Sequence, residues 1–248
     1  FCHMEKDMGI TGVGSSTKTF GTFTVRAEIA TSTDTNYTHQ AYVWICTSSC
    51  TVLTNFVKAM AVRWTFSADK TINKGTLIHK MGAFDSTATM SGAMKISWDI
   101  GTAATAKTVS STVKFSATEF DMVMRAEAQK TDEDLKVALV QSAGGLKFRF
   151  RGNINRSTKL ACAYYESSSP VGDGSATLQS GTTSDNPNGG HCFSLARNGD
   201  DWAYTATGAA SNGTFLSFPD QSANTIAAIT AATIEGTWLD MTTNPTSI

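Results

Sequence analysis

The chain has few charged residues and no excess of positive charge. Of its 248 residues only 17% are charged, and the formal net charge is −1 with a pI near 6.5. A protein that binds a polyanion usually presents a basic field. We therefore expect no nucleic-acid partner.

Long apolar runs and catalytic motifs are also missing from the sequence. No stretch approaches the roughly 20 apolar residues of a membrane-spanning helix, so a helical span is not expected. The four histidines lie in no nucleophile elbow and in no zinc-binding helix motif. The sequence therefore predicts a protein that is not an enzyme, with no catalytic residues and no cofactor.

The stretch from Phe120 to Glu166 holds four segments in which apolar and polar residues alternate. The apolar positions of one phase are Phe120, Met122, Met124, Leu135, Val137, Leu139, Leu146, Phe148, Phe150, Leu160 and Cys162. A repeat of two places successive side chains on opposite faces of a strand. Because turn-forming residues separate the segments, the pattern predicts an antiparallel meander with these apolar residues in the core.

Similar alternation runs through the first half of the chain, where Trp64 and Trp98 keep the phase of the apolar face. Short strands at regular spacing are typical of an all-β fold. We expect an antiparallel β-sandwich, jelly-roll-like or a two-sheet meander, with a closed up-and-down β-barrel as the alternative. The one credible helix lies within SANTIAAITAATIEG, residues 222–236, and its β-branched residues leave a strand as the alternative.

The composition also divides the chain. Residues 1–19 are polar and without a period, so they are interpreted as an irregular N-terminal arm. Residues 20–248 then form a single β-rich domain. Within it, residues 167–191 are crowded with Gly, Ser, Asn and Asp, which predicts a long loop.

Five cysteines indicate the compartment. If the apolar runs around WICTSSCTVL pair as a hairpin, Cys46 and Cys50 face each other and can form a disulfide; buried thiols or a metal site are the alternatives. Cys162 and Cys192 are candidates for a second disulfide. Both pairings predict an oxidising, extracellular or cell-surface location. Cys2 is left over, to be free, lipidated or bonded to another chain.

Candidate ligand sites are few. Trp202, after the NGDD turn with Asp200 and Asp201, is the best candidate for a sugar contact, although packing is the simpler role. Calcium is a further candidate ligand, with Asp173 and Asp185 in the long loop as carboxylate ligands.

The leading hypothesis is a non-catalytic secreted or cell-surface structural or adhesion protein that self-assembles into homo-oligomers or fibres. The N-terminal arm and an unpaired strand edge could join neighbouring copies by strand addition. One alternative is an outer-membrane β-barrel or pore. The other is a secreted carbohydrate- or calcium-dependent binding protein, with glycans or other surface proteins as partners.

Overall fold

The structure is a computed structural model. It describes residues 7–67, 73–82, 90–101, 107–117, 120–144, 146–168, 179–180, 191–198, 201–209, 229–236 and 238–247.

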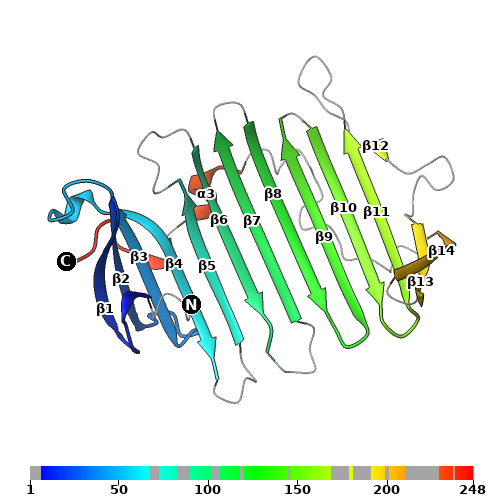
Figure 1. The fold of residues 1–248 in the computed structure, drawn as a ribbon, viewed down its shortest axis with the longest axis horizontal. Helices are drawn as coiled ribbons and strands as arrows, with labels where there is room; N and C mark the ends of the chain where they lie inside the picture. Colours follow the sequence, from blue (N-terminus) through cyan, green and yellow to red (C-terminus); the bar gives the residue numbers. More distant parts are fainter. Residues whose placement is uncertain are drawn as a thin grey trace. The chain divides into compact units, whose positions relative to one another are not determined.

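Strands make up most of the described chain (Figure 1). They are β1 (Gly14–Phe20), β2 (Phe23–Thr31), β3 (His39–Cys46), β4 (Val57–Phe66), β5 (Asn73–Met81), β6 (Met90–Asp99), β7 (Lys107–Ala117), β8 (Phe120–Lys130), β9 (Asp134–Ala143), β10 (Leu146–Asn155), β11 (Leu160–Ser168), β12 (Gln179–Ser180), β13 (His191–Asn198) and β14 (Asp201–Ala209). The helical elements are η1 (Leu53–Asn55), α3 (Ala231–Glu235) and η3 (Trp238–Asp240).

The all-β antiparallel prediction is confirmed, and the pairing defines the architecture further. Neighbours in the sequence are neighbours in the sheet, from β1 through β11 to β13 and β14, with β12 beside β11. A single antiparallel sheet therefore takes the place of the two sheets of a sandwich. Among the described strands β1 and β14 have one neighbour each, so the sheet is not closed into a barrel. The physical reason is that short connections pair each strand with the next one along the chain.

The chain divides into two compact units. Unit 1 holds Phe1–Thr102, Val113–Phe120 and Thr230–Ile248, and unit 2 holds Ala103–Thr112 and Asp121–Ile229. The predicted domain 20–248 thus contains two compact parts. The C-terminal segment, defined as residues 230–236 and 238–247, belongs to unit 1, although the strands of unit 2 separate it from the rest of that unit in the sequence.

The prediction of an irregular arm over residues 1–19 is wrong for its second half, because residues 14–20 form β1. The Ser- and Thr-rich sequence lacks apolar alternation, but a tight turn at Gly21 pairs it with β2 in register from Phe20↔Phe23 to Gly14↔Ile29. Backbone hydrogen bonds of a ladder need no apolar side chains, so composition alone missed this strand.

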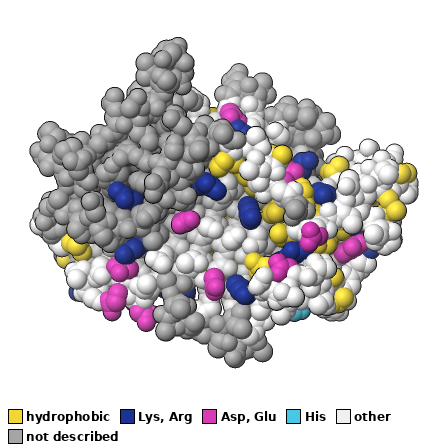
Figure 2. Space-filling model, turned by 180° about the vertical axis from the view of Figure 1, so that it is seen from behind, with side chains coloured by type: hydrophobic (Ala, Val, Ile, Leu, Met, Phe, Trp, Pro, Cys, Tyr) yellow, Lys and Arg dark blue, Asp and Glu magenta, His cyan; other side chains and the backbone are white. Residues whose placement is uncertain are grey.

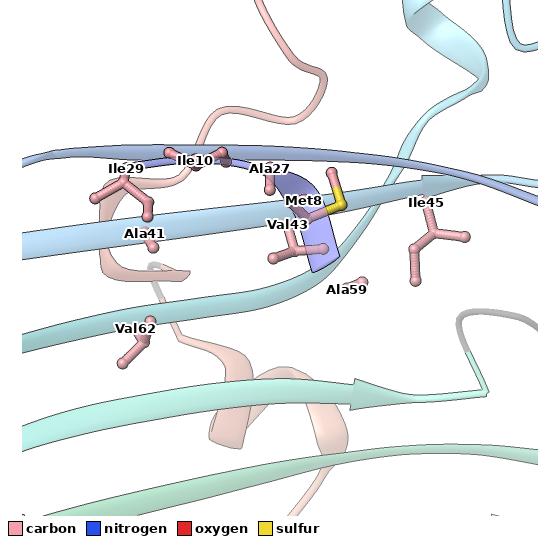
Figure 3. Close-up of a cluster of buried hydrophobic side chains, with 9 residues drawn as sticks. All are labelled: Met8, Ile10, Ala27, Ile29, Ala41, Val43, Ile45, Ala59 and Val62. Atoms are coloured by element: carbon pink, nitrogen blue, oxygen red, sulfur yellow. The ribbon is translucent and has the colours of Figure 1, made fainter. Parts of the chain in front are cut away.

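The sheet of unit 1 has a buried cluster on each face. Along β3, Val43 and Ile45 lie in cluster 1, whereas Trp44 and Cys46 lie in cluster 2. Cluster 1 consists of Met8, Ile10, Ala27, Ile29, Ala41, Val43, Ile45, Ala59 and Val62 (Figure 3). Cluster 2 consists of Trp44, Cys46, Phe56, Ala61, Ile78, Trp238 and Met241. Residues from near the N-terminus cover one face, and residues from the C-terminal segment cover the other.

The two tryptophans predicted to be core residues do pack on cluster 1, so that prediction is confirmed. Trp98 and Trp64 both lie opposite Gly75 in the ladder. A side chain at position 75 would collide with the indole of Trp98 and with the Arg63 carbonyl. Gly75 therefore makes room for the indole, whose Nε1 donates to Asn73 Oδ1 at 3.0 Å.

In unit 2 the prediction of which residues face the core is wrong at several positions of β8 and β9. Leu135, predicted to be buried, is 42% exposed, while Ala138 and Val140 of the opposite phase are fully buried. Val123, the one apolar residue out of phase in β8, is also buried. These three small or β-branched residues show that the covered face of a strand need not carry its longest apolar side chains.

The helix predicted over residues 222–236 is described only in its last part, as α3. Of the long loop at 167–191, the structure describes residues 167–168, which end β11, the two residues of β12, and His191 at the start of β13. The remainder of that loop lies outside the described residues.

Candidate functional site

The outer edge of β1 is one candidate site. β1 pairs with β2 and with no other described strand. Its two-residue connection has Gly21 at φ +57 in the first central position and Thr22 outside the positive-φ region, which is the geometry of a type II′ turn. In such a hairpin the residues that flank the turn exchange hydrogen bonds, and the alternate pairs do not. Ser15, Thr17 and Thr19 therefore direct their backbone N–H and C=O groups away from β2.

The N-terminal residues fix the position of β1. The ammonium of Lys18 donates to the Asp7 carbonyl at 2.6 Å and lies 5.6 Å from the centre of the Phe20 ring. Met8 and Ile10 are 6% and 5% exposed in cluster 1. Residues 7–10 are thus packed on unit 1, and the exposed, charged Lys18 of the edge strand is hydrogen-bonded to them.

The C-terminal segment is a second feature, which lies against β3 to β6. It begins at α3, where the Thr230 hydroxyl accepts a hydrogen bond from Thr233 N at 3.1 Å as an N-cap. It then makes a turn in which Trp238, Leu239 and Asp240 all have left-handed backbone angles, with φ of 53°, 51° and 62°. Each left-handed non-glycine residue costs about 1–2 kcal/mol, so the surrounding contacts must hold this turn.

Arg63 on β4 donates the shortest of the hydrogen bonds described between the sheet and this turn. Its side chain is 7% exposed, and NH2 donates to Asp240 Oδ2 at 2.6 Å and to the Leu239 carbonyl at 2.8 Å. Burial disfavours the charged guanidinium and is the largest single influence, but the interactions with Asp240 and Tyr42 together outweigh it and raise the pKa of Arg63. The Leu239 carbonyl also accepts from the Tyr42 hydroxyl at 2.7 Å, and burial raises the pKa of that tyrosine.

Arg26 on β2 provides a second anchor. Its side chain is also 7% exposed, and NH2 donates to Ser247 Oγ at 3.0 Å, while NH1 donates to Thr17 Oγ1 at 3.2 Å. Glu28 lies 3.3 Å from the same guanidinium and balances its charge. Arg26 thus joins the far end of the C-terminal segment to both β2 and the edge strand β1.

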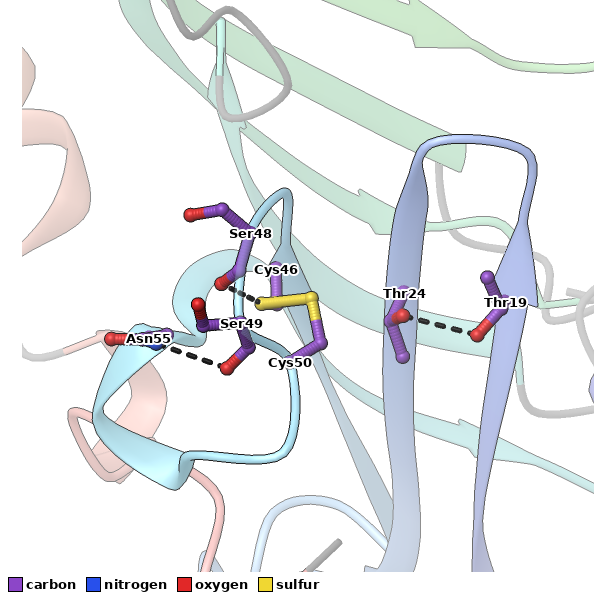
Figure 4. The surroundings of a disulfide bond; sticks show 7 residues. All are labelled: Thr19, Thr24, Cys46, Ser48, Ser49, Cys50 and Asn55. Atoms are coloured by element: carbon purple, nitrogen blue, oxygen red, sulfur yellow. Dashed lines mark hydrogen bonds between the residues drawn. A yellow bond between two sulfur atoms is a disulfide. The ribbon is translucent and has the colours of Figure 1, made fainter.

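The disulfide between Cys46 and Cys50 is confirmed, with a Cα–Cα distance of 5.6 Å (Figure 4). Its predicted position across a ladder is wrong, because Cys50 lies in the connection that leads to η1 and not on β4. The residue paired with Cys46 is Thr24 of β2, so the bond closes a turn at the end of β3. Cys50 packs against cluster 2, which places the bond beside the face of the sheet that the C-terminal segment covers.

The second predicted disulfide, Cys162–Cys192, is also confirmed. The two residues are directly paired on β11 and β13, with a Cα–Cα distance of 4.0 Å. This bond ties together the two strands that flank the long loop. The two disulfides fit an oxidising, extracytoplasmic environment, because such bonds persist only where thiols are not kept reduced.

The other candidate residues lie elsewhere. Asp201 and Trp202 begin β14, opposite Asn198 and Arg197 of β13. The remaining candidates lie outside the described residues: Asp200, Asp173, Asp185 and Cys2. Sugar and calcium binding therefore stay predictions. Within the described part of the chain, no group of three or more His, Cys, Asp or Glu side chains is placed to hold a metal ion.

Unit 2 carries a hollow of about 310 Å³ on the face of β9, β10 and β11. Its walls are Leu135, Val137, Phe150, Ile154, Ala161 and Ala163. Gly152 forms the floor, where a Cβ atom would lie 3.1 Å from Val137 Cγ2 and 3.2 Å from the Phe150 ring. A larger residue at position 152 would therefore press on Val137 and Phe150.

The charges on the described surface are mixed. On the face shown in Figure 2, Lys and Arg side chains are interspersed with Asp and Glu. Within the residues that the structure describes, no helix has the length and apolar character needed to cross a membrane.

Sequence reasoning identified the four disulfide cysteines but missed β1 and the anchored C-terminal segment. One usable signal was present: the arginines at positions 26 and 63 lie in strands of alternating polarity, and a charge of this kind must find a partner if it is buried. The partners themselves, Asp240 and Ser247, are more than 170 residues away in the sequence.

No family model matches this chain, and neither a curated protein nor a solved structure is significantly similar to it.

Proposed function

We propose that this protein is a non-catalytic structural or adhesion protein of the cell surface or extracellular space, which assembles with copies of itself. The observation that carries this proposal is the outer edge of β1, where Ser15, Thr17 and Thr19 direct a row of backbone groups away from β2, and no other described strand pairs with them. A strand from another copy can pair with such a row through main-chain hydrogen bonds.

Two further features support the proposal. The disulfides Cys46–Cys50 and Cys162–Cys192 suit a protein that works outside the reducing cytoplasm. The edge strand is rich in Ser and Thr, and Ser15 is exposed, so a second strand meets no bulky side chain there. The N-terminal residues 7–10 do not act as the donor in this assembly, because they are already packed on cluster 1.

The test uses one substitution at the edge. Ser15→Pro removes an outward N–H and leaves the β1–β2 hydrogen bonds in place, because Ser15 belongs to a pair that does not exchange them. We expect the parent protein to form oligomers by light scattering after size-exclusion chromatography, and Ser15→Pro to shift the population towards monomer.

Ser15→Ala is the matched control and should assemble as the parent does. Ser15→Lys, which keeps the backbone donor but adds a charge at the edge, should weaken assembly as well and does not depend on proline being accommodated. A parent that remains monomeric at high concentration contradicts the proposal, and so does assembly that is unchanged in both Ser15→Pro and Ser15→Lys.

A further inference from the structure

The groove under the C-terminal segment is built from a short, continuous part of the chain. Trp44, Cys46, Phe56, Ala61 and Ile78 come from β3, β4, β5 and the connection between β3 and β4. Each of these strands pairs with its sequence neighbour, so the backbone ladders that frame the groove do not include the C-terminal segment. The segment then fills it with Trp238 and Met241, which are 6% and 4% exposed.

The hydrogen bonds that hold the segment also come from this same part of the chain. Each joins the segment to β2, β3, β4 or the residue just before β4: Arg63–Asp240 at 2.6 Å, Tyr42–Leu239 at 2.7 Å, Asn244–Phe56 at 2.9 Å, Arg26–Ser247 at 3.0 Å and Trp44–Thr242 at 3.2 Å. Apolar anchors and directional bonds therefore specify this one segment for this one groove. None of these contacts involves a strand of unit 2.

The connection to the rest of the chain is long. Residues 210–229 separate the end of β14 from the start of the segment, and a chain of 20 residues spans at most about 70 Å. A second copy of the protein presents the same groove with the same anchors. Exchange of an identical element between copies keeps every contact and needs no new surface, which makes it a low-cost route to assembly.

We infer that the C-terminal segment is an exchangeable docking element, which in the assembled protein occupies the groove of unit 1 on a second copy. This inference rests on the proposed self-assembly and names a second contact for it, separate from the edge of β1. Reciprocal exchange gives a closed dimer, and exchange in one direction gives an open chain of copies.

The experiment asks which copy's segment fills each groove. Lys58 and Glu235 both contact Trp238: the Lys58 ammonium lies 5.6 Å from its ring centre, and Glu235 Oε2 accepts from its Nε1 at 2.9 Å. Cysteines at these positions can be joined by a short bismaleimide. β4 lies three strands in from β1, roughly 14 Å, so edge pairing alone does not bring position 58 of one copy near position 235 of another.

Full-length Lys58→Cys labelled with ¹⁵N and unlabelled Glu235→Cys, both with Cys2→Ser, are refolded together at high concentration. The oligomer is isolated and cross-linked, and its peptides are identified by mass spectrometry. We expect a link between a labelled and an unlabelled chain. The double variant Lys58→Cys/Glu235→Cys, kept dilute and monomeric, should give the same link within one chain, which shows that the pair is reachable.

Two results would overturn the inference, and they differ in what else they affect. In the first result, the mixed sample forms an oligomer but gives no link between labelled and unlabelled chains, while the double variant links within one chain. This result excludes exchange of the segment but leaves the proposed function standing. A protein that forms no oligomer at any concentration removes both the inference and the proposed function.

Discussion

The two compact units bury their sheets differently. In unit 1 both faces of the sheet carry buried clusters, completed by Met8 and Ile10 on one side and by Trp238 and Met241 on the other. In unit 2 the described strands bury Ala138 and Val140 on one face, while Leu135 and Ile154 on the other face are 42% and 44% exposed. The difference shows that alternation in a strand identifies two faces but does not say which face will be covered.

The largest expected effect comes from removing the indole that completes cluster 2. Trp238→Ala should lower the free energy of unfolding of unit 1 by about 3–5 kcal/mol, because a buried tryptophan leaves a cavity that the sheet cannot close. Leu135→Ala in unit 2 is the matched control and should cost much less, since that side chain already contacts water. Equal losses in the two variants, measured by denaturant unfolding, would contradict the contrast between the units.

Removal of each disulfide should lower the free energy of unfolding by a different amount in the same denaturant experiment. Replacing Cys162 and Cys192 by Ser opens a loop with a sequence separation of 30 and should cost about 3–4 kcal/mol in the chain-entropy model. Replacing Cys46 and Cys50 opens a separation of only 4 and should cost about 2 kcal/mol. A larger loss from the shorter loop would show that the Cys46–Cys50 bond supports the groove beneath the C-terminal segment beyond its effect on the unfolded chain.

A smaller effect is expected where the C-terminal segment is anchored by charge. Asp240→Asn keeps the shape of the side chain and should cost about 1 kcal/mol, because Asp240 is 67% exposed and its attraction to Arg63 is partly screened. The loss should shrink as salt is added, whereas the loss in Leu135→Ala should not. If the loss of stability in Asp240→Asn does not change with salt, the contact between Asp240 and Arg63 stabilises the protein through packing and not through charge.

The smallest effect concerns pH. Burial lowers the pKa of His79 on β5 below its ordinary value of 6.5, so the folded protein takes up this proton less readily than the unfolded chain. Stability should therefore be unaffected by His79 above about pH 6.5 and should fall as the pH drops through 6.5 towards the lower folded pKa. In His79→Gln the dependence of the unfolding midpoint on pH between 7 and 5 should be flatter. Identical slopes in the two proteins would show that His79 stays hydrated.

Much of the fold could be predicted from the sequence because it depends on local pattern. The alternation around Phe150 and the turn residues between strands specify an antiparallel meander, and Cys162 and Cys192 are partners because their strands pair. The strand that the sequence pattern does not predict is β1. β1 was missed because its stability comes from a tight turn at Gly21 and from backbone bonds, neither of which needs apolar residues.

The candidate site was predicted less completely than the fold. Ser15, Thr17 and Thr19 carry no pattern that marks an edge, since the edge exists only once the strand order is known. Trp202 is a candidate sugar contact because of its residue type alone. The structure places it at the start of β14, opposite Arg197, and sugar binding stays a prediction.

Local sequence patterns are enough to predict an antiparallel β-rich protein with two disulfides, because a two-residue period and the spacing of paired strands are properties of short stretches of chain. Three features become visible only in the folded chain: the C-terminal segment returns to unit 1, Arg63 bonds to Asp240, and Leu135 stays exposed. The contact between Arg63 and Asp240 joins residues more than 170 positions apart in the sequence. Whether a charged or apolar side chain is buried depends on such long-range packing and not on the residue type alone.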